Sequence, residues 1–227
     1  MAKAPSKGVI AYHELRKRII SGQLPPGSRL QQYELADELK MSITPLREAI
    51  RQLASEGWIR METHRDATVA DTNDAEAREL LEVRYALEPL AAELAALRRT
   101  EEDLLEIRAT AKALLPVSLE SGEEAITAHR AFHTAIFTSA HNDVLTKTLE
   151  DIWDKSDRYR RLSLTYPADD GGRAVDFAQH HRLAKLIEEG DGPQAAELSR
   201  EHIRNSLSAM RTGALGKLTR TYSPFGS

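Results

Sequence analysis

The pattern of apolar residues between Gln32 and Trp58 predicts two short helices joined by a tight turn. In both segments the apolar residues recur every three or four positions, which is the spacing of one helix face. These positions are Leu35, Ala36 and Leu39 in the first segment and Leu46, Ala49, Ile50 and Leu53 in the second. Between them, Ser42 and Thr44 are residue types that cap helix N-termini, and Pro45 suits a first helical turn. The second helix should therefore begin close to Ser42.

The polar face of this second helix carries side chains that suit DNA. Its N-terminal end has two hydroxyls, Ser42 and Thr44, and its exposed face has Arg47 and Arg51 at i and i+4. Arginine can donate two hydrogen bonds to guanine or to phosphate, and helix N-termini attract phosphate. The pattern fits a helix that enters the major groove, although a solvated face of a small helical domain has the same composition.

The segment after Trp58 favours the DNA-binding interpretation. Two short extended runs, residues 58–63 and 67–70, flank the sequence His64-Arg65-Asp66 and predict a β-hairpin. A hairpin directly after a helix-turn-helix is typical of a winged DNA-binding domain. Residues 28–30 could add a short strand to it.

From residue 74 onward the pattern is helical and predicts an antiparallel bundle of about six helices. Proline, glycine and asparagine separate the segments. The predicted helices cover about 74–98, 100–115, 121–140, 142–164, 172–189 and 193–211. We therefore expect a mainly α-helical protein with three parts. They are a winged helix-turn-helix domain at 9–71, an all-helical domain at 74–211 and a flexible tail at 212–227.

Composition and charge refine this picture. The chain has 41% hydrophobic and 29% charged residues, as an ordinary globular protein does. The net charge is −4, but residues 1–71 carry 11 basic and 9 acidic side chains, so the first domain is mildly basic. Sequence-independent attraction to DNA should then be modest, which leaves base contacts and dimerisation to supply specificity.

Several classes of protein are excluded by what the sequence lacks. It has no cysteine, which rules out disulfides and thiolate zinc sites. Its apolar runs fall far short of the ~18 residues of a membrane span, and the N-terminus has no apolar signal core. We expect a cytoplasmic protein that does not associate with membranes.

Four histidines of the helical segments could converge on one metal ion. His129 and His133 lie at i and i+4 on one helix, while His181 and His202 belong to the fifth and sixth predicted helices. Neutral imidazole binds zinc, nickel, copper or iron, and bundle interiors commonly hold such sites. A helical histidine taken alone is more often a surface residue or a hydrogen-bonded core residue. We keep that interpretation for the other four, His13, His64, His141 and His180.

The N-terminal motifs resemble those of GntR-type bacterial transcription regulators. The sequences Leu-Pro-Pro-Gly (24–27), Glu-Leu-Ala (34–36), Thr-Pro-Leu-Arg-Glu-Ala (44–49) and Glu-Gly (56–57) follow the family's order and spacing. The resemblance runs from about residue 12 to 71. It implies a homodimer that binds double-stranded DNA at a palindromic operator, with one recognition helix in each half-site. The residues implied to contact DNA are Ser42, Thr44, Arg47 and Arg51, together with His64 and Arg65 of the wing.

Two positions depart from the family's pattern. Ile43 stands where the family usually has a DNA-contacting arginine, and the wing tip lacks the usual glycine. Isoleucine can contact a thymine methyl group but cannot donate to guanine. The operator should therefore differ from the one common in the family.

The second half resembles the helical ligand-binding domain called FCD, which defines the FadR-like branch of the GntR family. The resemblance covers about residues 75–210. Its landmarks are 84–88 with 91–92, 132–133, 142, 181–182, 190–191 and 202–203. It implies a divalent metal held by an aspartate and three histidines, with a small carboxylate effector beside it.

The three histidines carry over to His133, His181 and His202, but the aspartate position is His129 here. Either all four histidines bind the ion, which favours zinc, nickel or copper over manganese, or His129 stands aside and water or effector completes the shell. We expect zinc or nickel.

Arginines are the second group that the FCD resemblance singles out. Arg84 is implied to line the effector cavity, where it could pair with a carboxylate. The alternative is an ion pair with Glu88, four residues later. Arg158, Arg160 and Arg161 could contribute to the same cavity, but a solvated face is the preferred interpretation.

Together these features predict a transcription regulator. In the family, the regulator usually represses its target, and the effector releases the repression. One alternative is a metal-independent regulator of the same family that senses a larger ligand. The competing class is a metalloenzyme built on the bundle. However, Arg130 stands in the His-x-x-x-His sequence where a zinc hydrolase has its glutamate base. We therefore expect no enzymatic activity.

Overall fold

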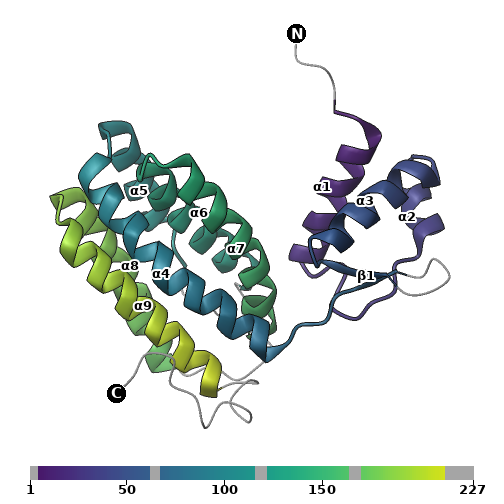
Figure 1. Cartoon of the computed structure of the whole chain (residues 1–227). Coiled ribbons are helices and arrows are strands. Elements are labelled where there is room, and N and C mark those ends of the chain that lie inside the picture. The colour runs from purple at the N-terminus through teal and green to yellow at the C-terminus, as the bar shows by residue number, and fades with distance from the viewer. Residues whose placement is uncertain (1–4, 62–66, 116–121, 164–169, 213–227) are drawn as a thin grey trace. The chain divides into compact units, whose positions relative to one another are not determined.

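The computed structural model describes residues 5–61, 67–115, 122–163 and 170–212 (Figure 1). Within these ranges the chain forms nine α-helices and one two-stranded antiparallel sheet, which confirms the mainly α-helical fold class. It divides into two compact units between Asn73 and Asp74. No helix of the described ranges is both long enough and apolar enough to cross a bilayer. The predicted flexible tail lies almost entirely outside these ranges.

The first unit is a winged helix-turn-helix. Its elements are α1 (Lys7–Ile20), α2 (Gln32–Glu38), α3 (Ile43–Ser55), β1 (Ile59–Met61) and β2 (Ala67–Val69). The two strands pair antiparallel with Ile59 opposite Val69. A bridge between Arg29 and Thr68 adds the short third segment that the sequence suggests.

The positions of α2 and α3 follow from the apolar stripes of the sequence. All four predicted inward positions of α3 are buried, and Leu35 and Ala36 of α2 pack into the same core. Trp58 follows α3 and packs into this core. Its backbone N–H donates to the Leu53 carbonyl at 2.9 Å. Burying one face of α3 leaves the opposite face to solvent.

The second unit is a helical bundle. Its helices are α4 (Asp74–Arg98), α5 (Glu101–Lys112), α6 (Gly122–Ser139), α7 (Asp143–Ser163), α8 (Asp170–Glu189) and α9 (Gly192–Thr212). Helix α4 is central, because it packs against α6, α7, α8 and α9, and it lies alongside α9 over much of its length (Figure 1). Aromatic and aliphatic side chains such as Phe132, Phe137 and Trp153 fill the core. The polar site described next lies within this bundle.

Candidate functional site

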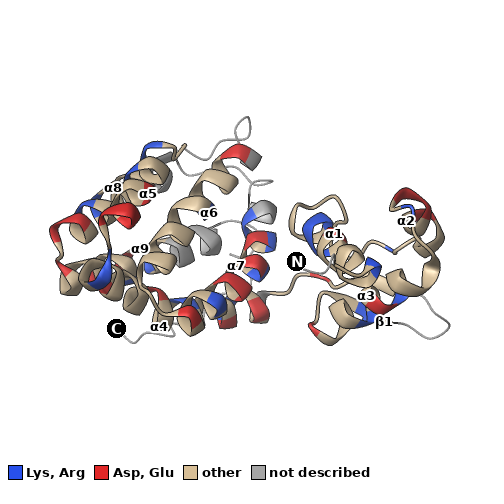
Figure 2. Cartoon of the chain, turned by 90° about the horizontal axis from the view of Figure 1, so that it is seen from above, with Lys and Arg blue, Asp and Glu red and all other residues tan. Residues whose placement is uncertain are grey.

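Helix α3 turns the residues expected to contact DNA away from the core of the winged unit. Ser42, Thr44 and Arg51 are exposed and Arg47 is half-buried. The Arg47 Nε donates to Oε1 of Gln32 at 3.3 Å, so α2 helps to orient this guanidinium. Basic side chains lie on α1 and α3, whereas α2 is mainly acidic (Figure 2).

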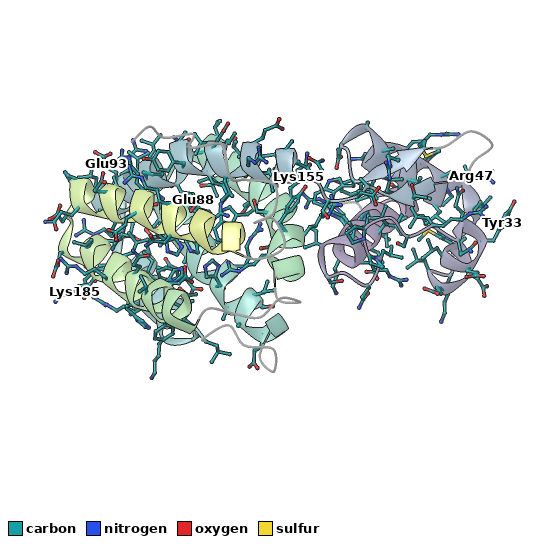
Figure 3. All side chains as sticks on the ribbon, turned by 90° about the horizontal axis from the view of Figure 1, so that it is seen from below. Tyr33, Arg47, Glu88, Glu93, Lys155 and Lys185 are labelled. Carbon is teal, nitrogen blue, oxygen red and sulfur yellow. The ribbon has the colours of Figure 1, made fainter. Side chains whose placement is uncertain are left out.

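One further exposed residue belongs to the same end of the winged unit. Tyr33 of α2 is 72% exposed, and Figure 3 shows it at the same end of this unit as Arg47. Tyr33 was not among the DNA-contacting residues predicted from the sequence, although an aromatic residue beside Glu34 on the polar face of a helix is a usable signal. The predicted wing contacts His64 and Arg65 lie outside the described residues and stay predictions.

Four buried histidines lie together in the helical unit. They are His129 and His133 of α6, His180 of α8 and His202 of α9. One ring nitrogen from each lies within 4.8 Å of the others, and the four residues are between 2% and 5% exposed. The Nε2 atoms of His133 and His180 are 3.0 Å apart. A tetrahedral ion with bonds of about 2.0–2.1 Å needs its nitrogens about 3.4 Å apart. To form such a shell, the 3.0 Å pair would have to widen and the longest separations, up to 4.8 Å, would have to shorten.

His180 occupies the place in this cluster that the sequence analysis predicted for His181. Consecutive residues differ by about 100° around a helix, so only one of the two can face the bundle interior. His180 shares its face with the buried Leu183 and Ile187, whereas His181 is exposed and contacts the ring of Phe177. The i+3 and i+7 apolar spacing from His180 was present in the sequence and identifies the inward histidine.

Burial keeps these imidazoles neutral. Removal from water lowers the pKa of all four below the ordinary value of 6.5, and the nearby Arg160 guanidinium lowers the pKa of His129 further. Neutral imidazole is the form that binds a metal ion. The cluster is therefore ready to accept a cation without first losing protons.

Acceptor oxygens lie behind three of the four rings. Oε2 of Glu88 is 3.9 Å from Nδ1 of His133. Oδ1 of Asp176 is 3.3 Å from Nδ1 of His202, and its Oδ2 is 3.8 Å from Nδ1 of His180. Carboxylates in this position orient the rings of metal-binding histidines and fix their tautomer. Asp176 was not among the residues predicted from the sequence, although its position four residues before His180 places both on one face of the helix.

The arginine that resemblance assigns to the effector is buried beside this cluster. Arg84 donates through Nε to Oε1 of Glu88 at 2.6 Å, which is the ion pair of the alternative interpretation. The same oxygen accepts from Nε1 of Trp153 at 2.7 Å, and the guanidinium lies 4.4 Å from the centroid of the Trp153 ring. Figure 3 labels Glu88 among the helices of the bundle. The effector role of Arg84 stays a prediction.

The interpretation of the α7 arginines as a solvated face is wrong for two of them. Arg158 is buried, and Arg160 is half-buried with its Nη1 against Nδ1 of His129. The cause is tertiary, because α7 packs against both α4 and α6 and has little exposed surface on that side. No periodicity in α7 itself could have shown which arginine reaches a histidine.

A helix-turn-helix with a wing is a DNA-binding fold, so the first unit places the protein among DNA-binding proteins. Comparison with known families agrees. Residues 9–69 match the model of bacterial regulatory proteins of the gntR family, and residues 79–205 match the FCD domain. The chain therefore belongs to the GntR family, in the FadR-like branch with an FCD domain.

Individual relatives are regulators as well. The chain is 32% identical to the HTH-type transcriptional regulator McbR of Escherichia coli K12 over 143 residues, which are 62% of this chain and 64% of McbR. It is 26% identical to the HTH-type transcriptional repressor GlaR of the same organism, over 90% of this chain and 96% of GlaR. The solved structure of E. coli McbR/YncC has the same fold, with a TM-score of 0.79 and 23% identity over 92% of this chain and 98% of that one. The protein is thus a DNA-binding transcription regulator.

Proposed function

We propose that this regulator is a repressor whose affinity for a palindromic operator is controlled by a divalent ion and a small carboxylate. The observation that carries the proposal is the buried cluster of four neutral imidazoles. An all-nitrogen donor set favours zinc or nickel over magnesium, calcium or manganese. His133, His180 and His202 would hold the ion, and His129 is the fourth candidate. The name of the relative GlaR supports the assignment as a repressor.

Charges around the cluster support an anionic effector. Arg84 and Arg160 both act electrostatically on the histidines, and guanidinium groups bind carboxylates through paired N–H donors. A small organic acid could coordinate the ion with one oxygen and pair with a guanidinium through another. It can change DNA affinity only if it binds the two conformations of the regulator unequally.

The packing of the helical unit could transmit such binding to the DNA-binding unit as a displacement of helices. Two of the four histidines lie on α8 and α9, and α9 packs along α4. Helix α4 begins at Asp74, directly after the winged unit in the chain. Drawing His180 and His202 toward an ion therefore displaces helices that contact α4. In this proposal residues 74–211 form the domain for effector binding and dimerisation.

The DNA-binding part of the proposal is tested by Arg47→Ala. We expect operator affinity to fall by about 1–3 kcal/mol, because a guanidinium at a base edge or phosphate is lost. The operator is first selected from random duplexes with the wild-type protein, and affinities are then measured by gel shift at fixed salt. Arg182→Ala, an exposed arginine of α8, is the matched control and should bind as the wild type does. Equal affinities for the Arg47 and Arg182 variants would refute the assignment of α3.

Homodimer formation is supported by an apolar stripe on α4. Val83, Leu90 and Leu97 are 43%, 43% and 61% exposed and lie seven residues apart. The half-buried Leu87 and Leu94 lie between them, so the five residues follow the 4-3 spacing of a helix-pairing seam.

The charges beside this stripe favour a second copy in antiparallel orientation. The acidic Glu79 and Glu82 lie toward the N-terminal end of α4, and Arg98 lies at its C-terminal end. In an antiparallel pair of α4 helices the acidic end of one copy meets the basic end of the other. The stripe is therefore complementary to itself.

Leu90→Glu should convert the dimer to monomer. A charge at the centre of an apolar interface must be buried without a partner, so we expect the dimer dissociation constant to rise at least about tenfold. Sedimentation velocity across a concentration series measures this change. Leu105→Glu places the same charge at an exposed leucine of α5 and should leave the association state unchanged. A dimer of undiminished stability in the Leu90 variant would exclude α4 as the interface.

A further inference from the structure

The four histidines of the cluster differ in what faces their Nδ1 atoms. His133, His180 and His202 each have a carboxylate oxygen within 3.9 Å of Nδ1. His202 also has Oε1 of Gln179 at 3.4 Å. At His129 the partner of Nδ1 is Nη1 of Arg160. Three rings thus face acceptors, and the fourth faces a donor.

This difference fixes the proton on His129. A guanidinium has five N–H donors and no acceptor, so Nδ1 of His129 must accept and carries no proton. In a neutral imidazole the proton is then on Nε2. Oδ1 of Asp176, 3.3 Å from Nδ1 of His202, favours the opposite tautomer in that ring, with Nδ1 protonated and the Nε2 lone pair available to an ion. Nε2 of His133 and Nε2 of His180 are 3.0 Å apart, so without a metal one of these two rings donates to the other.

His129 has two ways to bind an ion, and Arg160 obstructs both. If Nδ1 is the ligand atom, Arg160 occupies its lone pair. If Nε2 is the ligand atom, the proton must move to Nδ1, where an N–H group would then face the N–H of the guanidinium. Either way the contact between Arg160 and His129 must break before His129 can become a ligand.

We propose that Arg160 is a positioning residue that controls whether His129 becomes the fourth metal ligand. The inference rests on the proposed metal site and assigns its regulation. While Arg160 holds Nδ1, the ion has three histidine ligands and an open position. When Arg160 leaves, His129 closes the shell with a fourth nitrogen.

A carboxylate effector is the ligand that we expect to draw Arg160 away from His129. Arg160 already lies within electrostatic reach of Asp157 and Asp176, so its guanidinium has acidic groups to approach after it leaves His129. An effector carboxylate that pairs with Arg160 would draw it away and free His129. In that arrangement His129 takes the open position, and the effector binds the guanidinium and not the ion. Effector and ion would then bind cooperatively, each raising the affinity of the other by the same factor. This coupling would make the response depend on both ligands together.

The test uses the full-length chain and Co²⁺ as the only probe. Metal-free protein is titrated with Co²⁺ in competition with a chromophoric chelator, for the wild type, Arg160→Met, His129→Ala and the double variant. Methionine keeps a long side chain but has no N–H to donate. We expect Arg160→Met to bind Co²⁺ about tenfold more tightly, which is the factor for removing a competing hydrogen bond from a charged donor. The intensity of the cobalt absorption bands should also report a four-nitrogen tetrahedral shell.

The double variant separates this mechanism from simple charge repulsion. If the gain came only from removing a positive charge near the cation, it would persist in the His129→Ala background. The proposed gain should disappear in the His129→Ala background, because Arg160 then has no ligand to obstruct. Arg158→Met removes a neighbouring buried arginine of α7 and should leave Co²⁺ affinity unchanged. Thermal unfolding by circular dichroism confirms that each variant is folded.

Arg160→Gln provides a second variant if methionine disrupts folding. The glutamine carbonyl can accept from a protonated Nδ1, so this variant should also bind Co²⁺ more tightly than the wild type. Stoichiometric Co²⁺ binding with equal affinity in the wild type and both Arg160 variants would overturn the role of Arg160 and leave the metal site intact. A gain that persists without His129 would do the same. No Co²⁺ uptake by any variant would overturn the metal site and this inference with it.

Discussion

His133→Ala should abolish stoichiometric metal binding. His133 supplies the Nε2 atom that lies 3.0 Å from Nε2 of His180, and Glu88 lies behind its ring. We expect about one zinc or nickel ion per wild-type chain and a tenth of that or less in the variant, since a shell that loses a ligand loses most of its affinity. Elemental analysis of protein purified without a histidine tag or chelator measures the content directly.

Two neighbouring histidines of α8 make this prediction sharper. His180→Ala should lose the metal as His133→Ala does, whereas His181→Ala should retain it, because only His180 faces the cluster. The two variants differ by one position on one helix and so control for a general effect of the substitution. Metal lost from the His181 variant and kept in the His180 variant would contradict the geometry described above. Full metal content in the His133 variant would exclude the histidine cluster as the metal-binding site.

The local features of the fold were predictable because they depend on short-range chemistry. Helix α3 begins directly after Ser42, the predicted N-cap position, with Pro45 in its first turn, although the Ser42 side chain makes no capping hydrogen bond there. The start of α5 follows from the capping box that Thr100 forms with Asp103. Apolar spacing identified the helices of the bundle, and their ends differ from the expected ones by only a few residues.

The candidate site was only partly predictable, because its parts come from five helices, α4, α6, α7, α8 and α9, that are far apart in sequence. The i, i+4 pair His129 and His133 is a local pattern, and its members do lie together. The choice between His180 and His181 was also local, and comparing their positions with Leu183 would have decided it. The contact of Arg160 with His129 spans 31 residues and depends on how α7 packs against α6. Sequence periodicity carries no information about such a contact.

Glu88→Ala should destabilise the protein by about 3–5 kcal/mol, the usual cost of breaking a buried ion pair by removing one partner. Both Arg84 and Glu88 are buried, so the guanidinium would keep its charge in a site closed to water. The indole N–H of Trp153 would lose its acceptor as well. Urea denaturation of the metal-free protein at neutral pH gives the change in the free energy of unfolding. Glu106→Ala, at an exposed position of α5, should stay within about 0.5 kcal/mol of the wild type.

A variant without either charge separates the structural role of the Arg84–Glu88 pair from its role in binding. Arg84→Met combined with Glu88→Leu leaves no uncompensated charge, so most of the lost stability should return. If the double variant is as unstable as Glu88→Ala, the loss comes from packing and not from the buried guanidinium. Recovered stability would leave a folded protein without Arg84, in which metal content and effector response can be measured separately. Because Arg84 is already paired with Glu88, an effector that uses it must compete with or share that carboxylate. A double variant that binds metal but no longer responds to carboxylates would therefore place the effector at the Arg84–Glu88 pair.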